Sequence, residues 1–244
     1  MQILDDLIST LNFDAPVQEI RQGVFHTGVL TRHCGLAATL PRDALRQQPP
    51  LVKEPGTLCE RSAGDLVKLA HSNSILEAAI GMAAINSLLD VDEADMVVLN
   101  AGEVIADKGE GRRVAIVGHF PFIPNVRRLA AELWVIEKNP KEGDLPETDA
   151  ERVLPQADVV AITGTAITNH TLDGLLRLCK PEAFVILLGD TTPLSPILFD
   201  YGVDALAGTR VTDPDLALKC LSQGANFRQI KGTRRLLWKK SGAV

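Results

Sequence analysis

The stretch Asp158-Val159-Val160-Ala161-Ile162-Thr163-Gly164-Thr165 decides the fold, because an apolar run breaks directly into a short polar segment. Two other segments share this design: 114–122, where VAIV runs into GHFPF, and 184–193, where FVILL runs into GDTTP. Continuous apolar runs of this length are typical of strands in a parallel sheet that is covered on both faces. In such sheets, ligands bind beyond the carboxyl ends of the strands. The repeated pattern therefore predicts both an α/β fold and the edge of the sheet where a site lies.

Helical segments separate these strands in the second half of the chain. We predict helices near 125–130, 149–154, 167–179 and 214–223, with further strands at 133–137 and 204–207. Asp213-Pro214 is a clear helix start, with Asp as the N-cap and Pro at the first helical position. Alternating strands and helices predict βαβ units and a parallel sheet.

The first half has a different pattern. We predict a short helix over 1–10, an antiparallel strand meander over 17–40, and helices at 63–70 and 74–89. Ser74 and Glu77 fit a capping box at the start of the last helix. The acidic, glycine-containing segment 90–112 is interpreted as a linker or crossover. The boundary near 90–95 divides the chain into a smaller α+β domain, 1–92, and a larger parallel-sheet domain, 93–244.

Composition limits the classes of function. The chain has 244 residues, 45% of them hydrophobic, and a net charge of −6, which argues against a nucleic-acid partner. The one basic cluster, 234–240, is more typical of a solvated terminal strand or tail. No apolar run approaches a membrane span, and residues 1–6 do not resemble a signal peptide. With four cysteines and no CxxC pair, the sequence predicts a cytoplasmic protein without a membrane partner.

Gly118 and His119 follow the first of the three strands. A histidine at the carboxyl end of a strand can bind a metal, transfer a proton or hydrogen-bond a substrate oxygen. Phe120, Pro121 and Phe122 form a stiff apolar wall beside it. His119 is therefore a candidate metal ligand and a candidate general acid or base. The alternative is a histidine satisfied by the backbone, with both phenylalanines in the core.

Thr163, Gly164, Thr165 and Asn169 follow the second strand. Exposed N–H groups at the start of the next helix attract anions, which favours a carboxylate or phosphate cradle. The alternative is that Thr165 or Thr168 only caps that helix. The dinucleotide fingerprint G-x-G-x-x-G and the P-loop are both absent.

Gly189, Asp190, Thr191 and Thr192 occupy the equivalent place after the third strand. Hydroxyls and a carboxylate are grouped where a ligand would approach, although a self-bonded turn would have the same composition. Asn86 is a polar interruption near the end of an apolar helix and is a further candidate ligand-binding residue.

His33 and Cys34 are a weaker candidate pair. Imidazole and thiolate suit soft or borderline metals, but adjacent residues on a strand point to opposite faces. His26, His71 and His170 are interpreted as structural or exposed. No G-x-S-x-G or H-E-x-x-H motif is present, so covalent catalysis has no support.

These segments together resemble the putative heavy-metal chelation domain family, long classed as a domain of unknown function. The similar blocks are GHFPF at 118–122, ERVLPQADVV at 151–160, TGTAITN at 163–169 and GDTTPLSP at 189–196, with GMAAIN at 81–86 and GLA at 35–37 from the first half. One difference lies after Leu188, where the family commonly has Gly-Pro-Ser-Thr-Pro. Asp190 and Thr191 replace Pro and Ser here, which adds a possible oxygen ligand or a charge that discourages anions.

The resemblance implies a first domain like the N-terminal domain of enolase and a Rossmann-like second domain. It also implies a site in the cleft between them that binds a metal ion, a metal chelate or another small ligand. The expected cofactor is a divalent or heavy metal ion of unspecified identity, with His119, Asp190, His33 and Cys34 as candidate ligands.

Two other hypotheses stay open. The protein could be an enzyme or sensor for a small carboxylate- or phosphate-bearing molecule, with His119 as acid or base. It could also be an interaction module without chemistry. The sequence leaves open whether the chain forms a homodimer.

Overall fold

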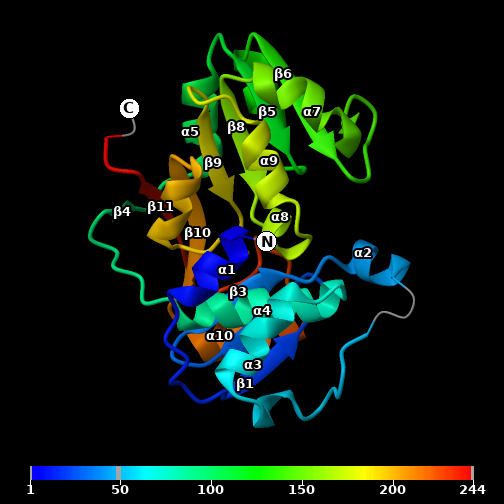
Figure 1. The fold of residues 1–244 in the computed structure, drawn as a ribbon, viewed down its shortest axis with the longest axis vertical. Helices are drawn as coiled ribbons and strands as arrows, with labels where there is room; N and C mark the ends of the chain where they lie inside the picture. The colour runs from blue at the N-terminus through cyan, green and yellow to red at the C-terminus, as the bar shows by residue number, and fades with distance from the viewer. Residues whose placement is uncertain (1, 48–50, 243–244) are drawn as a thin grey trace.

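A large, mostly parallel sheet is the frame of the structure (Figure 1). In the computed structural model, which describes residues 2–47 and 51–242, this sheet is eight-stranded, in the order β4-β11-β10-β9-β8-β5-β6-β7. Its strands are β4 (Met96–Val97), β5 (Arg113–Val117), β6 (Glu132–Glu137), β7 (Leu145–Pro146), β8 (Val159–Thr163), β9 (Phe184–Leu188), β10 (Ala205–Val211) and β11 (Thr233–Lys239). The six strands from β7 to β10 run parallel, and β11 and β4 extend the sheet by antiparallel pairing.

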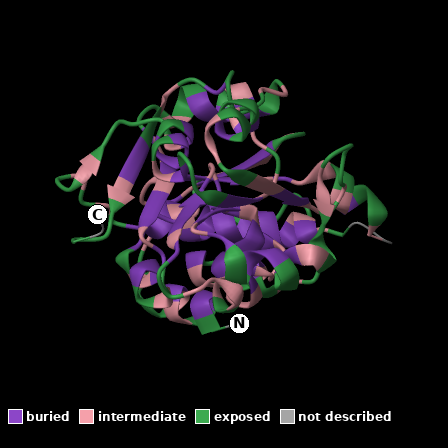
Figure 2. Cartoon of the chain, turned by 90° about the horizontal axis from the view of Figure 1, so that it is seen from above, coloured by how far each residue is buried: buried purple, intermediate pink, exposed green. Residues whose placement is uncertain are grey.

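The central strands are buried on both faces, as their continuous apolar runs predict. Val159, Val160, Ala161 and Ile162 of β8 are all fully buried, and alternate residues belong to two separate core clusters. One cluster includes α5 (Ala101–Gly109) and α6 (Ile123–Leu129), and the other includes α7 (Ala150–Val153) and α9 (Leu172–Leu178). Figure 2 shows the buried strands between these outer layers. The predicted α/β fold is confirmed.

The helices of this half differ from the prediction in two places. The predicted helix 167–179 is divided into α8 (Thr165–Thr168) and α9, because His170 between them has a φ of 64°. Segment 90–112 is more than a linker, since it contains β4 and α5. The side chain of Asn100 caps α5 by accepting a hydrogen bond from Gly102 N–H, and the helix buries an apolar face against the sheet.

The first half forms the predicted small antiparallel sheet and its helices. The meander consists of β1 (Glu19–Gln22), β2 (His26–Leu30) and β3 (Cys34–Ala38). The predicted helices are α1 (Gln2–Ser9), α3 (Ala63–Lys68) and α4 (Ile75–Leu88), whereas α2 (Pro41–Arg46) was not predicted. After β10, α10 (Pro214–Ser222) packs with this half. The side chain of Asp213 caps α10 as predicted, since it accepts a hydrogen bond from Leu216 N–H.

The predicted capping box at α4 is wrong. Ser74 makes no side-chain cap and instead donates to the carbonyl of Leu51. Glu77 is buried and accepts hydrogen bonds from Lys53 N–H at 2.9 Å and from the hydroxyl of Ser72 at 2.5 Å. The carboxylate therefore ties the chain before α4 to that helix, a role that local spacing does not reveal.

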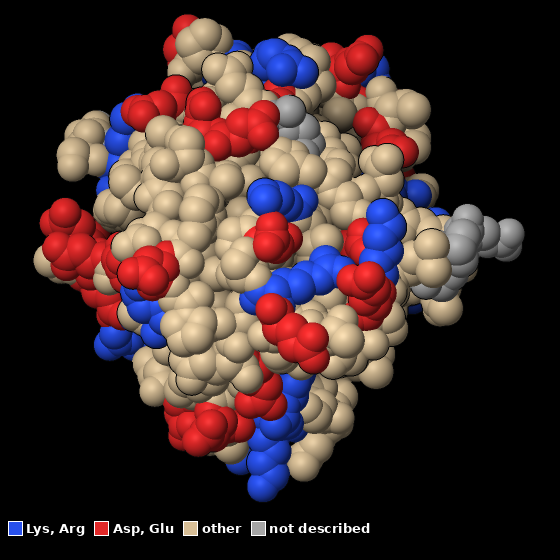
Figure 3. Space-filling view, turned by 60° about the horizontal axis from the view of Figure 1, so that its bottom comes forward, with Lys and Arg blue, Asp and Glu red and all other residues tan. Residues whose placement is uncertain are grey.

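The two halves of the chain share their packing. Helix α10, from the second half, lies against β1 and β2, and its Leu218 and Leu221 join Cys34 and Leu36 in one core cluster (Figure 1). Within the described residues, no helix is long and apolar enough to cross a membrane. On the face shown in Figure 3, acidic and basic side chains are interspersed, so no continuous basic surface covers it.

Candidate functional site

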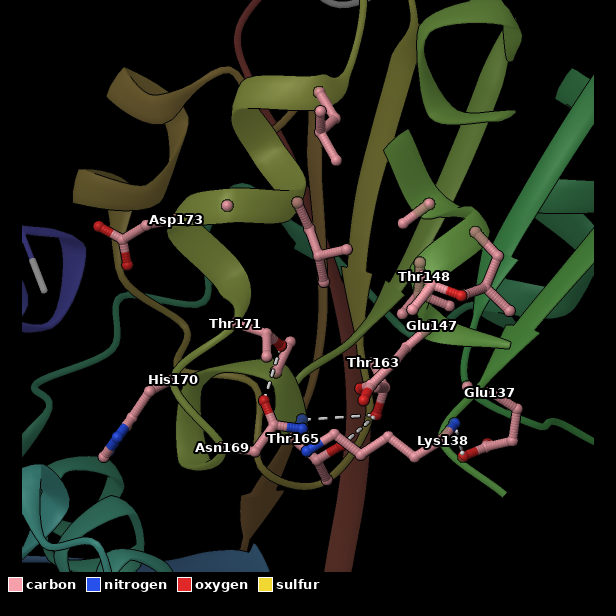
Figure 4. Close-up of a pocket in the computed structure, with 18 of the residues that line it drawn as sticks. Glu137, Lys138, Glu147, Thr148, Thr163, Thr165, Asn169, His170, Thr171 and Asp173 are labelled. Atoms are coloured by element: carbon pink, nitrogen blue, oxygen red, sulfur yellow. Dashed lines mark hydrogen bonds between the residues drawn. The ribbon is translucent and has the colours of Figure 1, made fainter. Parts of the chain in front are cut away.

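A cavity of about 1040 Å³ opens at the carboxyl edge of the large sheet. It lies where β5, β6 and β8 end, and α9 and segment 147–151 form further walls (Figure 4). Gln2, Leu40 and Asp43 from the first half of the chain also line it. The cavity is therefore bounded by both halves.

The strand order explains this location. The chain proceeds from β5 to β6 and β7 on one side, then returns to β8, β9 and β10 on the other. The switch point between β5 and β8 leaves a crevice outside the carboxyl ends of both strands, which is where open α/β sheets bind ligands. Gly118, directly after β5, and Thr163, the last residue of β8, both line the cavity.

His119 lies at the rim of this cavity. Its side chain is 38% exposed, and its Nε2 atom is 3.9 Å from Oδ2 of Asp144, whose side chain is 5% exposed. Gly118 has a φ of 104°, and a Cβ atom there would lie 3.1 Å from that of Thr163. This close turn requires glycine and positions His119. Phe120 lines the cavity, and its ring stacks on Phe122 with the ring centroids 5.1 Å apart.

Polar groups converge in the cavity at the end of β8, beside the turn that carries His119 (Figure 4). The hydroxyl oxygens of Thr163 and Thr165 are 3.0 Å apart, and Asn169 accepts a hydrogen bond from the Thr171 hydroxyl at 2.7 Å through its carbonyl oxygen. That bond leaves the amide NH₂ of Asn169 as a donor for a ligand. Thr163, Thr165 and Asn169, which were predicted as ligand-binding, lie together in one cavity, and Thr171 joins them.

Lys138 is a cavity residue that the sequence reasoning missed. It follows β6 directly, and Figure 4 shows its side chain extending toward Thr165 and Asn169. Within the described residues, no carboxylate forms an ion pair with it. Glu137, the last residue of β6, was missed with it and lines the same cavity. The available signal was position, because both residues follow an apolar strand as the three recognised polar segments do.

The cavity carries both signs of charge. Its acidic residues are Asp43, Glu137, Glu147, Glu151 and Asp173, and its basic residues are Lys138 and Arg177. The walls therefore offer a cationic group at Lys138 and several carboxylate acceptors.

The segment after β9 lies elsewhere, where the small sheet meets the large one. Thr191 accepts a hydrogen bond from Ala38 N–H at 2.9 Å, and Asn86 donates to the carbonyl of Thr191 at 3.1 Å. A Cβ atom on Gly164 would lie 2.5 Å from the hydroxyl of Thr192. Five residues predicted as ligand-binding do not line the cavity: Asn86, Gly164, Gly189, Thr191 and Thr192. Asn86 and Thr191 instead connect α4 and β3 to the segment after β9, and the Thr192 hydroxyl is buried there without a partner among the described residues.

Asp190 lies in the same contact, with 12% of its side chain exposed. Its Oδ2 is 2.9 Å from Nε2 of His26, and its Oδ1 accepts a hydrogen bond from the Thr209 hydroxyl at 2.5 Å. Burial acts to raise the pKa of Asp190, but the hydrogen bonds and charge of these partners outweigh it, so the pKa is lowered. The carboxylate thus joins β2 to the large sheet and does not lie in the cavity with His119.

The other predicted metal ligands are also apart. His33 contacts Asp90 through Nε2 at 3.0 Å and Arg210 through Nδ1 at 3.2 Å. Cys34 is buried, and that burial raises the pKa of its thiol to about 12. Across residues 2–47 and 51–242, no group of three or more His, Cys, Asp or Glu side chains could hold a metal ion. The donor set present does not fit a bare ion bound by protein alone.

Comparison with known proteins gives a consistent result. Two family models, both described as "Putative heavy-metal chelation", match residues 4–89 and 100–238. An uncharacterized protein of Methanocaldococcus jannaschii is 29% identical over 178 residues, which cover 70% of this chain and 69% of that protein.

Two solved structures are similar over almost their whole length. A protein of unknown function from the DUF364 family of Desulfitobacterium hafniense is 26% identical with a TM-score of 0.86, and one from Pyrococcus horikoshii is 25% identical with a TM-score of 0.84. In both, the similarity covers 98% of each chain. The resemblance in the polar strand-end segments therefore extends to the complete fold.

Proposed function

Because this chain belongs to the putative heavy-metal chelation family, we propose that its cavity binds an anionic metal chelate, in which a small organic molecule already holds the metal. Tight metal sites made by protein alone need several side-chain ligands, and catalytic sites commonly supply three. In this cavity the imidazole offered to a metal would be that of His119, because the second histidine of the lining, His170, contacts the carbonyl of Ala70 through Nε2 at 2.9 Å. A chelate brings its other ligands with it.

The observation that carries this proposal is that His119 and a set of anion-binding donors line the same cavity. Lys138, Asn169 and the hydroxyls of Thr163 and Thr165 offer positive charge and hydrogen bonds. Carboxylate arms, which most small chelators carry, accept from such donors. The cavity volume of about 1040 Å³ is at the upper end of the range for small-molecule sites, about 300–1,000 Å³. Both ends of a chelate would therefore be held.

A second function rests on the contact between His119 and Asp144. The carboxylate of Asp144 lies 3.9 Å from Nε2 of His119, so a small rotation of the imidazole would form the hydrogen bond that orients a general base. In this role the ligand would be a carboxylate- or phosphate-bearing substrate, and His119 would transfer a proton to or from it. Asp144→Asn would then reduce turnover while ligand binding persists.

Thermal shift separates the chelate from its parts. We expect nickel citrate, at about 100 times its dissociation constant, to raise the melting temperature by about 5–10 °C. Nickel chloride alone gives little shift because the protein supplies too few ligands, and citrate alone gives a smaller shift through Lys138. The readout is the melting temperature over a titration of each compound.

Two histidine variants control this experiment. His119→Gln should weaken the binding of nickel citrate by about tenfold or more and leave the binding of citrate alone unchanged. His71→Gln removes an imidazole that is 40% exposed, similar to His119, but lies outside the cavity. This variant should bind nickel citrate and citrate as the unmodified protein does. Equal stabilisation by nickel chloride and nickel citrate, or a chelate response that survives His119→Gln, would reject the proposal.

A further inference from the structure

We propose that the ligand of this cavity carries a ribose, and that Glu137 accepts hydrogen bonds from its two hydroxyls. This inference rests on the same cavity being the ligand site, as in the proposed function. It adds the chemical class of the organic part, a nucleoside bearing one anionic group.

The position of Glu137 carries the inference. The strand order β7-β6-β5-β8-β9-β10 is that of dinucleotide-binding sheets, with β5 first and β6 second. In those sheets an acidic residue, about 20 residues after the glycine turn that follows the first strand, binds the ribose hydroxyls. Glu137 ends β6, follows Gly118 at about this spacing, and lines the cavity.

The contacts of Glu137 leave it able to accept. One carboxylate oxygen accepts from Lys138 N–H at 2.9 Å, and Figure 4 shows the side chain at the wall of the cavity. In the described part of the chain, no Lys, Arg or His side chain pairs with Glu137. A carboxylate that is oriented by one backbone bond and lacks a cation partner suits a pair of neutral hydroxyl donors.

The turn after β5 excludes a dinucleotide. A pyrophosphate needs the backbone N–H groups of a glycine-rich turn and the helix that follows it. This chain places His119, Phe120 and Pro121 there, and α6 has only seven residues with Pro124 in its first turn. The ligand is therefore a single nucleoside, with no diphosphate at this turn.

The remaining walls fit the other parts of such a ligand. The face of Phe120, stacked on Phe122 with an interplanar angle of 12°, offers a flat apolar surface to a nucleobase. Lys138, Thr165 and Asn169 offer donors to an anion. That anion is a phosphate or a carboxylate, and the walls described here suit either.

Calorimetric titration with adenosine monophosphate, its 2′-deoxy form and S-adenosylhomocysteine tests the inference. We expect adenosine monophosphate or S-adenosylhomocysteine to bind, and the tighter of the two identifies phosphate or carboxylate as the anion. Removing the 2′-hydroxyl of the monophosphate, or making Glu137→Gln, should each weaken binding by about tenfold. The Glu137→Gln protein should bind the 2′-deoxy form only slightly more weakly than either single change predicts, because both changes remove the same contact.

Matched controls keep the test specific. Glu132→Gln changes a carboxylate at the opposite end of β6 and should bind as the unmodified protein does. Equal binding of the ribose and deoxyribose forms, no effect of Glu137→Gln, or no binding of any nucleoside would overturn the ribose inference. Nickel citrate binding distinguishes the two proposals: if it persists while nucleosides fail, only the ribose inference is wrong. If nucleosides bind and nickel citrate does not, only the proposal that the cavity binds a metal chelate is wrong.

Discussion

At the residue scale, two glycines allow α4 to pack as closely as it does. A Cβ atom on Gly35 would lie 2.1 Å from the carbonyl oxygen of Ala83, and one on Gly81 would lie 2.0 Å from the backbone nitrogen of Ala70. Both contacts are with backbone, which cannot rotate aside as a side chain could. The small residues of α4 therefore let the helix lie directly on β3 and on the turn after α3.

Gly35→Ala should consequently destabilise the protein. The added methyl group must push α4 away from β3, and overpacking of this kind costs about 1–3 kcal/mol, or more when only backbone is in contact. Gly174→Ala is the control, because a Cβ atom there meets nothing within 4 Å and alanine favours helix. Urea unfolding at neutral pH measures both. If the Gly35→Ala protein were as stable as the control, α4 would not pack against β3 as closely as the contact at Gly35 indicates.

Individual residues also show where sequence reasoning ends. Thr163, Thr165 and His119 could be assigned to one edge because each directly follows an apolar strand. Asp190 follows a strand in the same way, yet its partner is His26, far away in the chain. Lys138 directly follows the predicted strand 133–137, but no motif marked it. Which strand-end segment faces the cavity depends on the packing of the small sheet, and no local pattern encodes that.

At the element scale, the starts of β5 and β8 are fastened by one carboxylate. Asp158 accepts hydrogen bonds from Arg113 N–H at 3.0 Å and from the Arg113 guanidinium at 3.3 Å, and it pairs with Lys180. The Arg113 guanidinium, followed by Lys180, holds the pKa of Asp158 well below its usual range. The ionised carboxylate therefore stabilises the parallel pairing at the end of the sheet opposite the cavity.

The stability that Asp158 contributes should depend on pH. Its pKa is about 3.9 in the unfolded chain and lower in the folded one, so the contribution is complete above about pH 4 and is lost as the pH falls through the folded value. Asp158→Asn should cost about 1 kcal/mol at pH 7, given the partial exposure of the pair, and less at pH 3. Urea unfolding across this range measures the difference.

Asp149→Asn is a suitable comparison, because Asp149 pairs with Arg152 only one helical turn away and much of that arginine is exposed. We expect a smaller cost for this change at pH 7. A cost for Asp158→Asn that stays constant down to pH 3 would show that the carboxylate is not the source of the stabilisation.

Elements were predictable where burial is uniform along the strand. The apolar runs of β5, β8 and β9 are buried on both faces, so their composition alone identifies them. Helix α5 was missed because its segment is acidic and contains glycine, and apart from the buried glycines only Val104, Ile105 and Ala106 form its buried face. The break between α8 and α9 was missed because it depends on a positive φ at His170, which composition does not reveal.

At the scale of the whole molecule, the cavity exists because two halves of the chain pack together. One core cluster joins Leu4 of α1 and Ile85 of α4 to Leu172 of α9 and Leu236 of β11. The hydrogen bonds of Asn86 and Thr191 add polar contacts to this packing. Asp43 and Gln2 of the first half are thereby placed opposite the strand ends of the second. Neither half alone encloses the cavity.

A crystal structure with nickel citrate, using anomalous diffraction at the nickel edge, tests the central claim most directly. The account predicts an anomalous peak about 2 Å from a ring nitrogen of His119, with a citrate carboxylate against Lys138 and Asn169. A peak at His33, Cys34 or Asp190 instead, or citrate bound outside the cavity, would contradict it.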